Sequence, residues 1–405
     1  MKKIKIQENY NETVDNNYIF NFDIQSDSKP TEPLLHKHSR FIYILEGHGK
    51  IKIQNKIIAL FPGVIISIAP WQISEIIEVS EELTYYLLVY NFNLLNIYIK
   101  KEFNINSENI NIINSLYKSN VIIPSSKDSL KIKSIFEDIK DEFGLCSVNF
   151  ISESKPYSTL YGISKFAELL VIYLRNINET TPADDEINPD MIFMYMFLNC
   201  CNNLSLELIS KAFFMSESSI SKYIHDFTGI GFYELLNEMR IFKAKFLLTH
   251  TNLNIKDIAY ILNYSDPGQL SKIFHDKYHL GTKDFKKLQC PESLVNIRLD
   301  YRGLKIIEYM YENYDEELDI GTVSDLFKTT PKNINSILMY YIEKNFYNFL
   351  NQIRIHKACD LLTETELPIA DISALVGYNS TKTFVRNFIK ILNITPSEFR
   401  TTYIK

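Results

Sequence analysis

The stretch LPIADISALVGYNSTKTFVRNFIKILNITPSEFR, residues 367–400, decides the fold of the C-terminal part of the chain. Pro368 suits the first turn of a helix, where its missing N–H would have no partner in any case. Apolar residues then recur at helical spacing and predict one buried face: Ile369, Ile372, Leu375 and Val376. Gly377 can adopt the left-handed conformation that ends a helix abruptly.

A second helix is predicted directly after this glycine. Asn379 or Ser380 can cap its first turn, and Phe384 and Phe388, four residues apart, predict its inner face. Two helices joined by a tight turn form a helix-turn-helix arrangement, whose second helix can lie in the major groove of DNA.

The same residues resemble one family. The patterns I-x-x-I-S-x-x-V-G-Y, F-x-x-x-F and N-I-T-P-S-E-F-R, all within residues 369–400, are similar to the end of the DNA-binding domain of AraC/XylS-type transcription regulators. The resemblance implies a DNA-binding transcription regulator that binds double-stranded DNA, uses no cofactor and is not an enzyme.

The chain also contains an internal repeat. Residues 204–285 align without a gap with residues 318–399, and 23 of the 82 aligned positions are identical. Each copy is about as long as one AraC-type domain. We therefore expect two tandem all-α domains, at 188–289 and 303–405, each with two helix-turn-helix motifs around a long connecting helix.

The resemblance places the DNA-facing side chains on the outward side of four recognition helices. In the second copy these are Thr381, Lys382, Val385 and Arg386, with Lys390 near the backbone, and Lys332, Asn333, Asn335 and Ser336. In the first copy they are Pro267, Gly268, Ser271 and Lys272, and Ser218, Ser219, Ser221 and Lys222. Arg and Asn can contact guanine and adenine in a bidentate manner, and Lys and Ser can contact bases or phosphates. A solvated helix surface is the plain alternative for any single position.

The two copies depart from the family pattern to different extents. Phe214 and Lys328 replace the glycine expected in the first turn of each copy. Asn263 stands where the second copy has Gly377, which is tolerable because Asn can adopt the left-handed conformation. The first copy is the more degenerate, and we expect it to contact DNA through its backbone or to have become structural.

Residues 1–125 predict a different kind of domain. Short β-branched or aromatic runs alternate with turn residues, which indicates a small antiparallel barrel or sandwich. The runs are residues 41–45, 50–53, 57–60, 64–68 and 84–90, and the turns are residues 46–49, 54–55 and 62–63. The sequence from His36 to Ser74 resembles a cupin-like sensor domain. The expected fold is thus multidomain α+β, with an N-terminal cupin-like antiparallel β-barrel.

His36 and His38 match the start of a cupin metal site. Ile42 and Ser74 stand where such a site would supply a carboxylate and a further histidine. Two histidines rarely hold a metal tightly, so we expect no metal here. We assign His36, His38 and Tyr43 to the binding of an unknown small-molecule effector. The competing hypothesis is a cupin-type metalloenzyme.

Residues 126–187 predict a helical linker region. Helical periodicity covers residues 129–143 and 159–174, and the polar, acidic stretch 176–188 is typical of a linker. The two helices either pair two subunits in a homodimer or cap the barrel.

The composition of the chain bears on its cellular location and on its binding partners. No run of about 18 apolar residues is present, so no membrane span is expected. The five cysteines form no C-x-x-C pair and predict reduced thiols in a cytoplasmic protein, without a disulfide or zinc site. Because the net charge of the chain is −6, the electrostatic attraction to DNA must come from local clusters of basic residues. A regulator that acts through protein contacts, for example with RNA polymerase, and without base readout is therefore a second alternative.

Overall fold

The computed structural model describes residues 4–7, 20–90, 115–117, 119–145, 156–177, 189–264, 266–288 and 302–403. The chain divides into two compact units, Met1–Phe197 with Ser205–Glu234, and Leu198–Leu204 with Leu235–Lys405. The boundaries 1–125, 126–187, 188–289 and 303–405 stay predictions. Most of the expected linker at 176–188, together with Cys146 and Cys290, lies outside the described residues.

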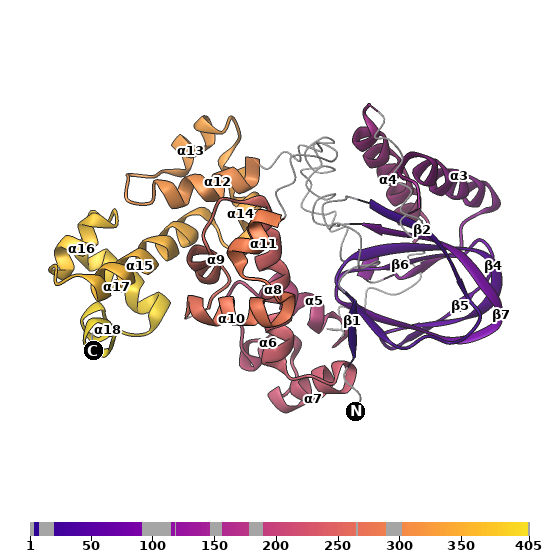
Figure 1. The fold of residues 1–405 in the computed structure, drawn as a ribbon, viewed down its shortest axis with the longest axis horizontal. Helices are drawn as coiled ribbons and strands as arrows, with labels where there is room; N and C mark the ends of the chain where they lie inside the picture. The colour runs from indigo at the N-terminus through magenta and orange to yellow at the C-terminus, as the bar shows by residue number, and fades with distance from the viewer. Residues whose placement is uncertain are drawn as a thin grey trace. The chain divides into compact units, whose positions relative to one another are not determined.

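The first unit contains a β-rich sheet, drawn in indigo to purple in Figure 1. The described strands are β1 (Lys5–Gln7), β2 (Phe20–Asp27), β3 (Leu34–His36), β4 (Ser39–Ile53), β5 (Lys56–Leu60), β6 (Ile65–Ile68), β7 (Gln72–Tyr90) and β8 (Val121–Ile122). They follow the order β1-β3-β7-β4-β6-β8, while β2 pairs with β7 and β5 pairs with β4. All pairings are antiparallel except that of β1 with β3.

The glycine-rich segment of this sheet corrects one prediction. Residues 46–49 do not form a turn between two strands, because they are an irregular part of the single strand β4. Gly47 has φ +88°, and a Cβ there would lie 2.0 Å from the Glu82 carbonyl oxygen of β7. Glycine inside a strand commonly marks such a bulge or close approach, and from sequence alone it reads as a turn. The turns at 54–55 and 62–63 are confirmed.

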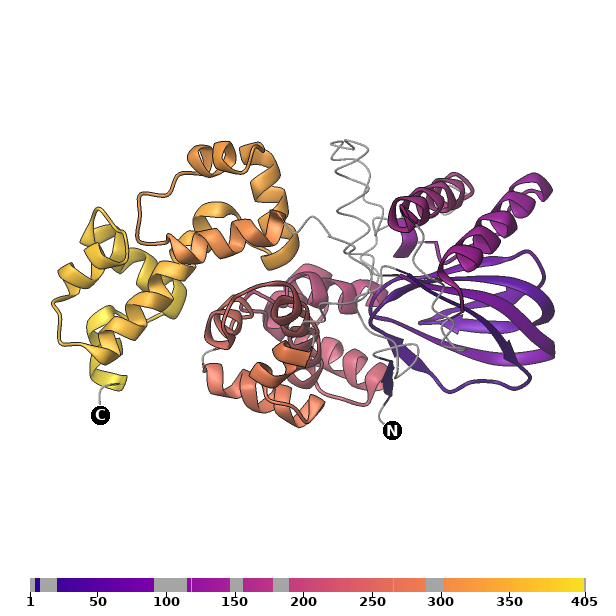
Figure 2. The same ribbon diagram turned by 45° about the horizontal axis from the view of Figure 1, so that its top comes forward.

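The two faces of the sheet have different partners. One face forms an apolar cluster that includes Ile44, Ile51, Ile66, Leu83, Leu87 and Val89. The other face packs its aromatic rings against helices α3 (Ser126–Phe143) and α4 (Ser158–Arg175), which lie side by side over the sheet in Figure 2. Phe136 and Phe166, which lie in the two periodic segments 129–143 and 159–174, are buried there. Leu160, in the second of these segments, is 65% exposed.

The first helix-turn-helix of copy one belongs to the same unit as the sheet. Helices α5 (Ile192–Leu198), α6 (Leu206–Phe213) and α7 (Glu217–Thr228) follow the short helix η2 (Pro189–Met191). Asp190 accepts hydrogen bonds at one carboxylate oxygen from Asn55 at 2.8 Å and from Tyr223 at 2.9 Å. The β4–β5 hairpin is thereby tied to α7.

The second unit contains the rest of copy one and all of copy two. The helices are α8 (Phe232–His250, whose first three residues belong to the first unit), α9 (Ile255–Ile261), α10 (Pro267–Tyr278), α11 (Thr282–Leu288), α12 (Arg302–Glu312), α13 (Ile320–Leu326), α14 (Pro331–Ile342), α15 (Phe346–Glu364), α16 (Ile369–Leu375), α17 (Thr381–Leu392) and α18 (Pro396–Tyr403). Helix α15 packs against α14, α16, α17 and α18, so both helix-turn-helix motifs of copy two rest on one long helix (Figure 2).

The two copies share their internal hydrogen bonds as well as their helices. Arg240 donates from Nε to the Cys200 carbonyl at 2.8 Å and from Nη2 to the Asn202 carbonyl at 3.1 Å. Arg354 makes the same two bonds, each of 2.8 Å, to the carbonyls of Tyr314 and Glu316, 114 residues further on. In each copy this arginine therefore fixes the loop that leads into the first helix-turn-helix.

Every tight turn between the paired helices contains a residue in the left-handed conformation. These residues are Phe214 (φ 49°), Asn263 (φ 58°), Lys328 (φ 50°) and Gly377 (φ 84°). The conformation is therefore kept even where the sequence departs from glycine or asparagine, at a local cost in backbone strain.

Within the second unit, α9 of copy one contacts α15 of copy two. The rings of Tyr260 and His356 stack with centroids 4.1 Å apart, and Gln352 donates to the Tyr260 carbonyl at 2.8 Å. Lys357 forms an ion pair with the buried Asp257 at 2.9 Å. Apolar, hydrogen-bonding and charged contacts thus join the two copies.

Candidate nucleic-acid interface

Helix α17 has one buried and one exposed face. Phe384 and Phe388 are fully buried, and their rings pack edge to face on each other and on Tyr378 and Phe399. On the opposite face Thr381, Lys382, Arg386 and Lys390 are exposed. Val385, expected to face outward, is only partly exposed, because it packs against this core.

The turn before α17 requires glycine. Helix α16 ends at Leu375, and Gly377 has φ +84°. A Cβ there would lie 2.7 Å from the Asp315 carbonyl oxygen and 2.9 Å from Nη2 of Arg354. Because glycine has no Cβ, the turn can pack closely on the loop that Arg354 holds. Ser380 occupies the N-cap position but makes no side-chain capping bond.

Helix α14 presents a smaller polar surface. Lys332, Asn333 and Ser336 are exposed, and Thr330 caps the helix by accepting from the Asn333 N–H at 3.2 Å. Asn335 is partly buried, and its side-chain oxygen accepts from the Phe346 N–H at 2.9 Å. Asn335 therefore accepts from the first N–H of α15, whose N-cap is Asn345, a role that its sequence position did not reveal.

In copy one the corresponding helices are α7 and α10. Ser218 and Ser219 are exposed and hydrogen-bond with the capping Ser216, at 2.9 and 2.8 Å. Ser221 is half-buried and Lys222 is exposed; Ser271 and Lys272 repeat this arrangement on α10. At the expected outward positions, α7 and α10 thus present serine hydroxyls and one lysine each.

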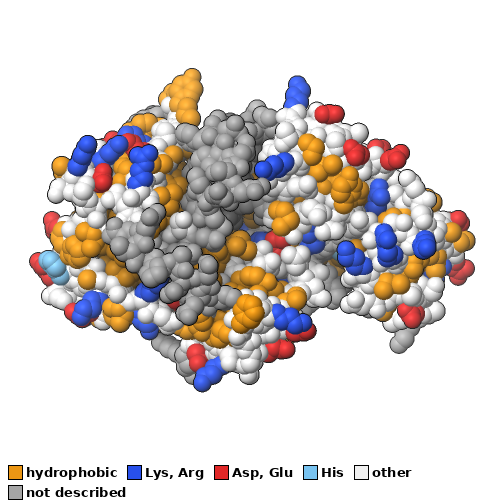
Figure 3. Space-filling model, turned by 180° about the vertical axis from the view of Figure 1, so that it is seen from behind, with side chains coloured by type: hydrophobic (Ala, Val, Ile, Leu, Met, Phe, Trp, Pro, Cys, Tyr) orange, Lys and Arg blue, Asp and Glu red, His pale blue; other side chains and the backbone are white. Residues whose placement is uncertain are grey.

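The recognition helices of the two copies carry different charges. Helices α14 and α17 hold four basic and no acidic side chains, whereas α7 and α10 hold three of each. Asp276, exposed on α10, takes the place of Lys390 on α17. The net charge of the whole chain does not reveal this contrast, because it sums over both copies. On the face in Figure 3, Lys and Arg side chains gather over the C-terminal helices, at the right of the view.

The candidate ligand residues of the first unit have different surroundings. His36 is buried and its Nε2 lies 2.7 Å from Oγ of Ser74. Burial, and then the nearby charge of Arg40, hold the pKa of His36 well below its usual value, so the ring is neutral near pH 7. His38 is half-buried.

Tyr43 lies elsewhere, between the sheet and α3. Its hydroxyl is 3.1 Å from Oγ of Ser129, and its ring stacks on Phe136 and Tyr86. His36 is therefore a buried side chain and Tyr43 contributes to the packing of the helix on the sheet, while their assignment to effector binding stays a prediction.

Comparison with known proteins identifies the repeated domain. A family described as "Helix-turn-helix domain" matches residues 209–287 and 323–402, which confirms the tandem repeat. An uncharacterized HTH-type transcriptional regulator of Staphylococcus aureus (strain COL) is 29% identical over 159 residues, or 39% of this chain and 21% of that protein. The chain thus spans about a fifth of the length of this relative.

Comparison with solved structures matches, among others, the following two proteins. The C-terminal domain of AraT, a response regulator from Geobacillus stearothermophilus, is 26% identical and covers 26% of this chain and 87% of its own, with a TM-score of 0.25. An apo ToxT variant from Vibrio cholerae is 14% identical and covers 68% of this chain and all of its own, with a TM-score of 0.33.

The chain therefore carries an AraC-type helix-turn-helix domain in two tandem segments and is homologous to HTH-type transcriptional regulators. The relatives are regulators, in agreement with the expectation that the chain is not an enzyme. Among the described helices, none is long and apolar enough to cross a membrane.

Proposed function

We propose that this protein is a sequence-specific DNA-binding transcription regulator in which copy two is the main reader of DNA. The observation that carries the proposal is the charge of α14 and α17, whose four basic side chains are opposed by no acidic one on either helix. Phosphate attraction needs such a local cluster in a chain of net charge −6.

The fold gives each basic side chain on α17 a role in this proposal. Lys382 and Arg386 are one turn apart on the exposed face, where Arg can contact guanine O6 and N7. Lys390, a further turn along, suits the phosphate backbone. Helix α15 has 19 residues and is about 28 Å long, near the rise of one DNA turn, so the two motifs that it carries can enter successive major grooves.

Copy one has a weaker case for base readout. Its two recognition helices carry as many acidic as basic side chains, and Pro267 and Gly268 begin α10 without polar side chains. We assign it hydroxyl and backbone contacts to phosphate, together with contacts to copy two.

The first unit is the part that we propose to receive a signal. We infer that its sheet is a cupin-like sensor for a small-molecule effector. The contact from Asn55 through Asp190 to Tyr223 supports this role, because it joins the sheet to a recognition helix inside one unit. If this contact has two arrangements and an effector binds one of them more tightly, the effector would change how α7 is presented to DNA.

We also propose a cytoplasmic location and a homodimer formed through α3 and α4. Leu130, Leu160 and Val171 are exposed on the outer surfaces of these helices, while their inner faces cover the sheet. RNA polymerase is the further partner that transcription activation would require.

Selection of bound duplexes from a random DNA pool by the full chain tests the main proposal. We expect an enriched motif whose affinity falls in Arg386→Ala, with Lys272→Ala as the matched variant on copy one. A pool that stays unenriched while the protein still captures other proteins would favour regulation by protein contact instead.

A further inference from the structure

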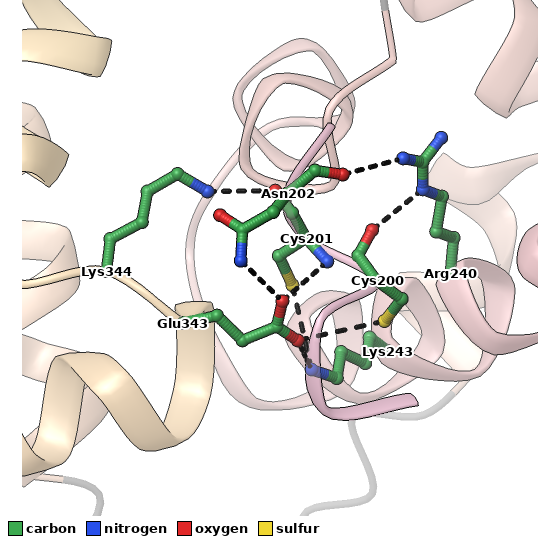
Figure 4. A network of polar contacts seen from close by, with 7 residues as sticks. All are labelled: Cys200, Cys201, Asn202, Arg240, Lys243, Glu343 and Lys344. Atoms are coloured by element: carbon green, nitrogen blue, oxygen red, sulfur yellow. Dashed lines mark hydrogen bonds and ion pairs between the residues drawn. The ribbon is translucent and has the colours of Figure 1, made fainter. Parts of the chain in front are cut away.

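A cluster of thiols and charged side chains lies inside the second unit (Figure 4). Cys200 and Cys201 belong to the loop after α5, and Glu343 follows the last residue of α14. The ligand atoms of these three residues all lie within 4.8 Å of one another, and all three are buried. In the part of the chain that the structure describes, this is the one such group of three.

The loop conformation brings two adjacent cysteines to the same side. Neighbouring side chains diverge in a strand, but Cys200 and Cys201 lie in a turn and are both 0% exposed. Bonds from both copies hold the turn in place. Arg240 donates to the Cys200 carbonyl at 2.8 Å, and Lys344 donates to the Cys201 carbonyl at 2.8 Å.

Glu343 is held toward the thiols by the backbone. Its Oε2 accepts from the Cys201 N–H at 2.9 Å and from the Asn202 amide at 3.2 Å, which leaves Oε1 facing the sulfur atoms. Glu343 has φ 60°, a conformation that favours glycine, and Gly229 occupies the equivalent position in copy one. The second copy thus keeps a strained glutamate where it can aim a carboxylate at two thiols.

We propose that Cys200, Cys201 and Glu343 form a binding site for a thiophilic divalent cation of the Zn²⁺ class. Two thiolates and a carboxylate are a donor set that Zn²⁺ accepts, with Zn–S near 2.3 Å and Zn–O near 2.1 Å. Ligands at these distances on a tetrahedral ion are about 3.6 Å apart. Sγ of Cys200 and Oε1 of Glu343 are 3.9 Å apart, so a small closure suffices.

A cation already lies among these donors. The ammonium of Lys243 forms an ion pair with Oε1 of Glu343 and lies 3.7 Å from Sγ of Cys201. A divalent ion would take its place, with two deprotonated thiols compensating its charge, and Lys243 would withdraw. Lys243 is thus the internal competitor of the metal, and its removal should strengthen binding.

The sequence predicted thiols without a metal. It could not indicate this site, because the proposed ligands are far apart in sequence. Glu343 is 142 residues from Cys201, and adjacent cysteines do not have the C-x₂₋₄-C spacing of most zinc sites. Its three ligands come from both copies, so a bound ion would crosslink the loop before α6 to the end of α14. This inference does not depend on DNA binding.

Cobalt substitution of the reduced, metal-free full chain tests the site directly. We expect one Co²⁺ per chain, with the visible bands of tetrahedral cobalt and thiolate charge transfer, displaced by one equivalent of Zn²⁺. Cys200→Ser and Cys201→Ser should each reduce the charge-transfer band and weaken binding at least a hundredfold, and Glu343→Gln at least tenfold. Cys359→Ser, a buried thiol outside the cluster, is the matched control and should bind normally.

Lys243→Met separates metal binding from misfolding. Loss of the competing ammonium should raise Co²⁺ and Zn²⁺ affinity about tenfold, a gain that a damaged fold cannot produce. The proposal is overturned if the wild-type chain shows no thiolate charge-transfer band at saturating Co²⁺. It is also overturned if the band survives in the double serine variant, or if Lys243→Met leaves affinity unchanged or lower.

Discussion

Copy one and copy two have the same framework and different surfaces. In both, an arginine of the long helix holds the preceding loop and stacks on a tyrosine, Tyr264 or Tyr378, with 5.3 and 5.4 Å from guanidinium to ring. That tyrosine donates to an asparagine on the same long helix, Asn237 or Asn351, at 3.1 and 2.8 Å. The charges of the recognition helices differ: they are balanced in copy one and entirely basic in copy two. The duplicated fold thus keeps the arginine, tyrosine and asparagine contacts that hold it together, whereas its exposed helix faces can change.

The largest effect expected from this comparison is at the turn before the last recognition helix. Gly377→Val should lower the free energy of unfolding by roughly 3 kcal/mol or more, because it adds positive-φ strain and a clash with the Asp315 carbonyl. Asn263→Gly, the matched change in copy one, should be nearly neutral. Denaturation followed by far-UV circular dichroism measures both; fluorescence of Trp71, the only tryptophan, monitors the other unit. Equal losses in the two variants would contradict the difference between the turns.

Next in size is the contrast in DNA readout. Arg386→Ala should cost about 1–3 kcal/mol on the enriched site and relax the preference at one base pair, because a bidentate guanine contact is lost. Lys272→Ala, at the equivalent position, should cost less. Titrations against the enriched and a scrambled duplex compare them, and a larger loss from Lys272→Ala would reverse the ranking of the copies.

One residue of the long helix of copy two should make the free energy of unfolding depend on pH, by up to about 2 kcal/mol, and the equivalent residue of copy one should not. Burial, and then Lys344 and Lys357, lower the pKa of His356 to about 3, whereas copy one has Phe242 at that position. Below the unfolded pKa of about 6.5 the unfolded chain gains a proton that the folded chain refuses, so stability falls toward lower pH, by at most about 1.4 kcal/mol per pH unit.

His356→Phe, which copies the first repeat, should remove this part of the pH dependence. Chemical denaturation at pH 7 and pH 5 gives the difference between variant and wild type, in which the titration of His36 cancels. An identical pH dependence in the two proteins would show that His356 keeps an ordinary pKa in the folded state.

The smallest expected effects concern phosphate contacts. Lys390→Ala should weaken binding to all duplexes alike and reduce the slope of log affinity against log salt by about one. Asp276→Ala in copy one should do the opposite, with a modest gain and little change in sequence preference. If Asp276→Ala has no effect on affinity at low salt, α10 does not approach the DNA.

The sequence predicted the elements better than their contacts. The apolar spacing of residues 367–400 located α16 and α17 to within two residues, because capping, periodicity and a left-handed glycine are local signals. The bulge at Gly47 was predicted as a turn, since glycine signals both. Asn335 on the helix surface and Glu343 in the buried cluster could not be assigned, because their partners lie 11 and 142 residues away.

The reciprocal ion pairs between the copies bear on how the gene could change. Lys243 and Lys357 are equivalent residues, yet Lys243 pairs with Glu343 of copy two and Lys357 pairs with Asp257 of copy one. Each repeat therefore completes the electrostatics of the other. A deletion that returned the gene to a single repeat would leave a largely buried lysine without its acid, a defect worth several kcal/mol. Once this exchange of partners had evolved, selection on folding alone would hold the copy number at two.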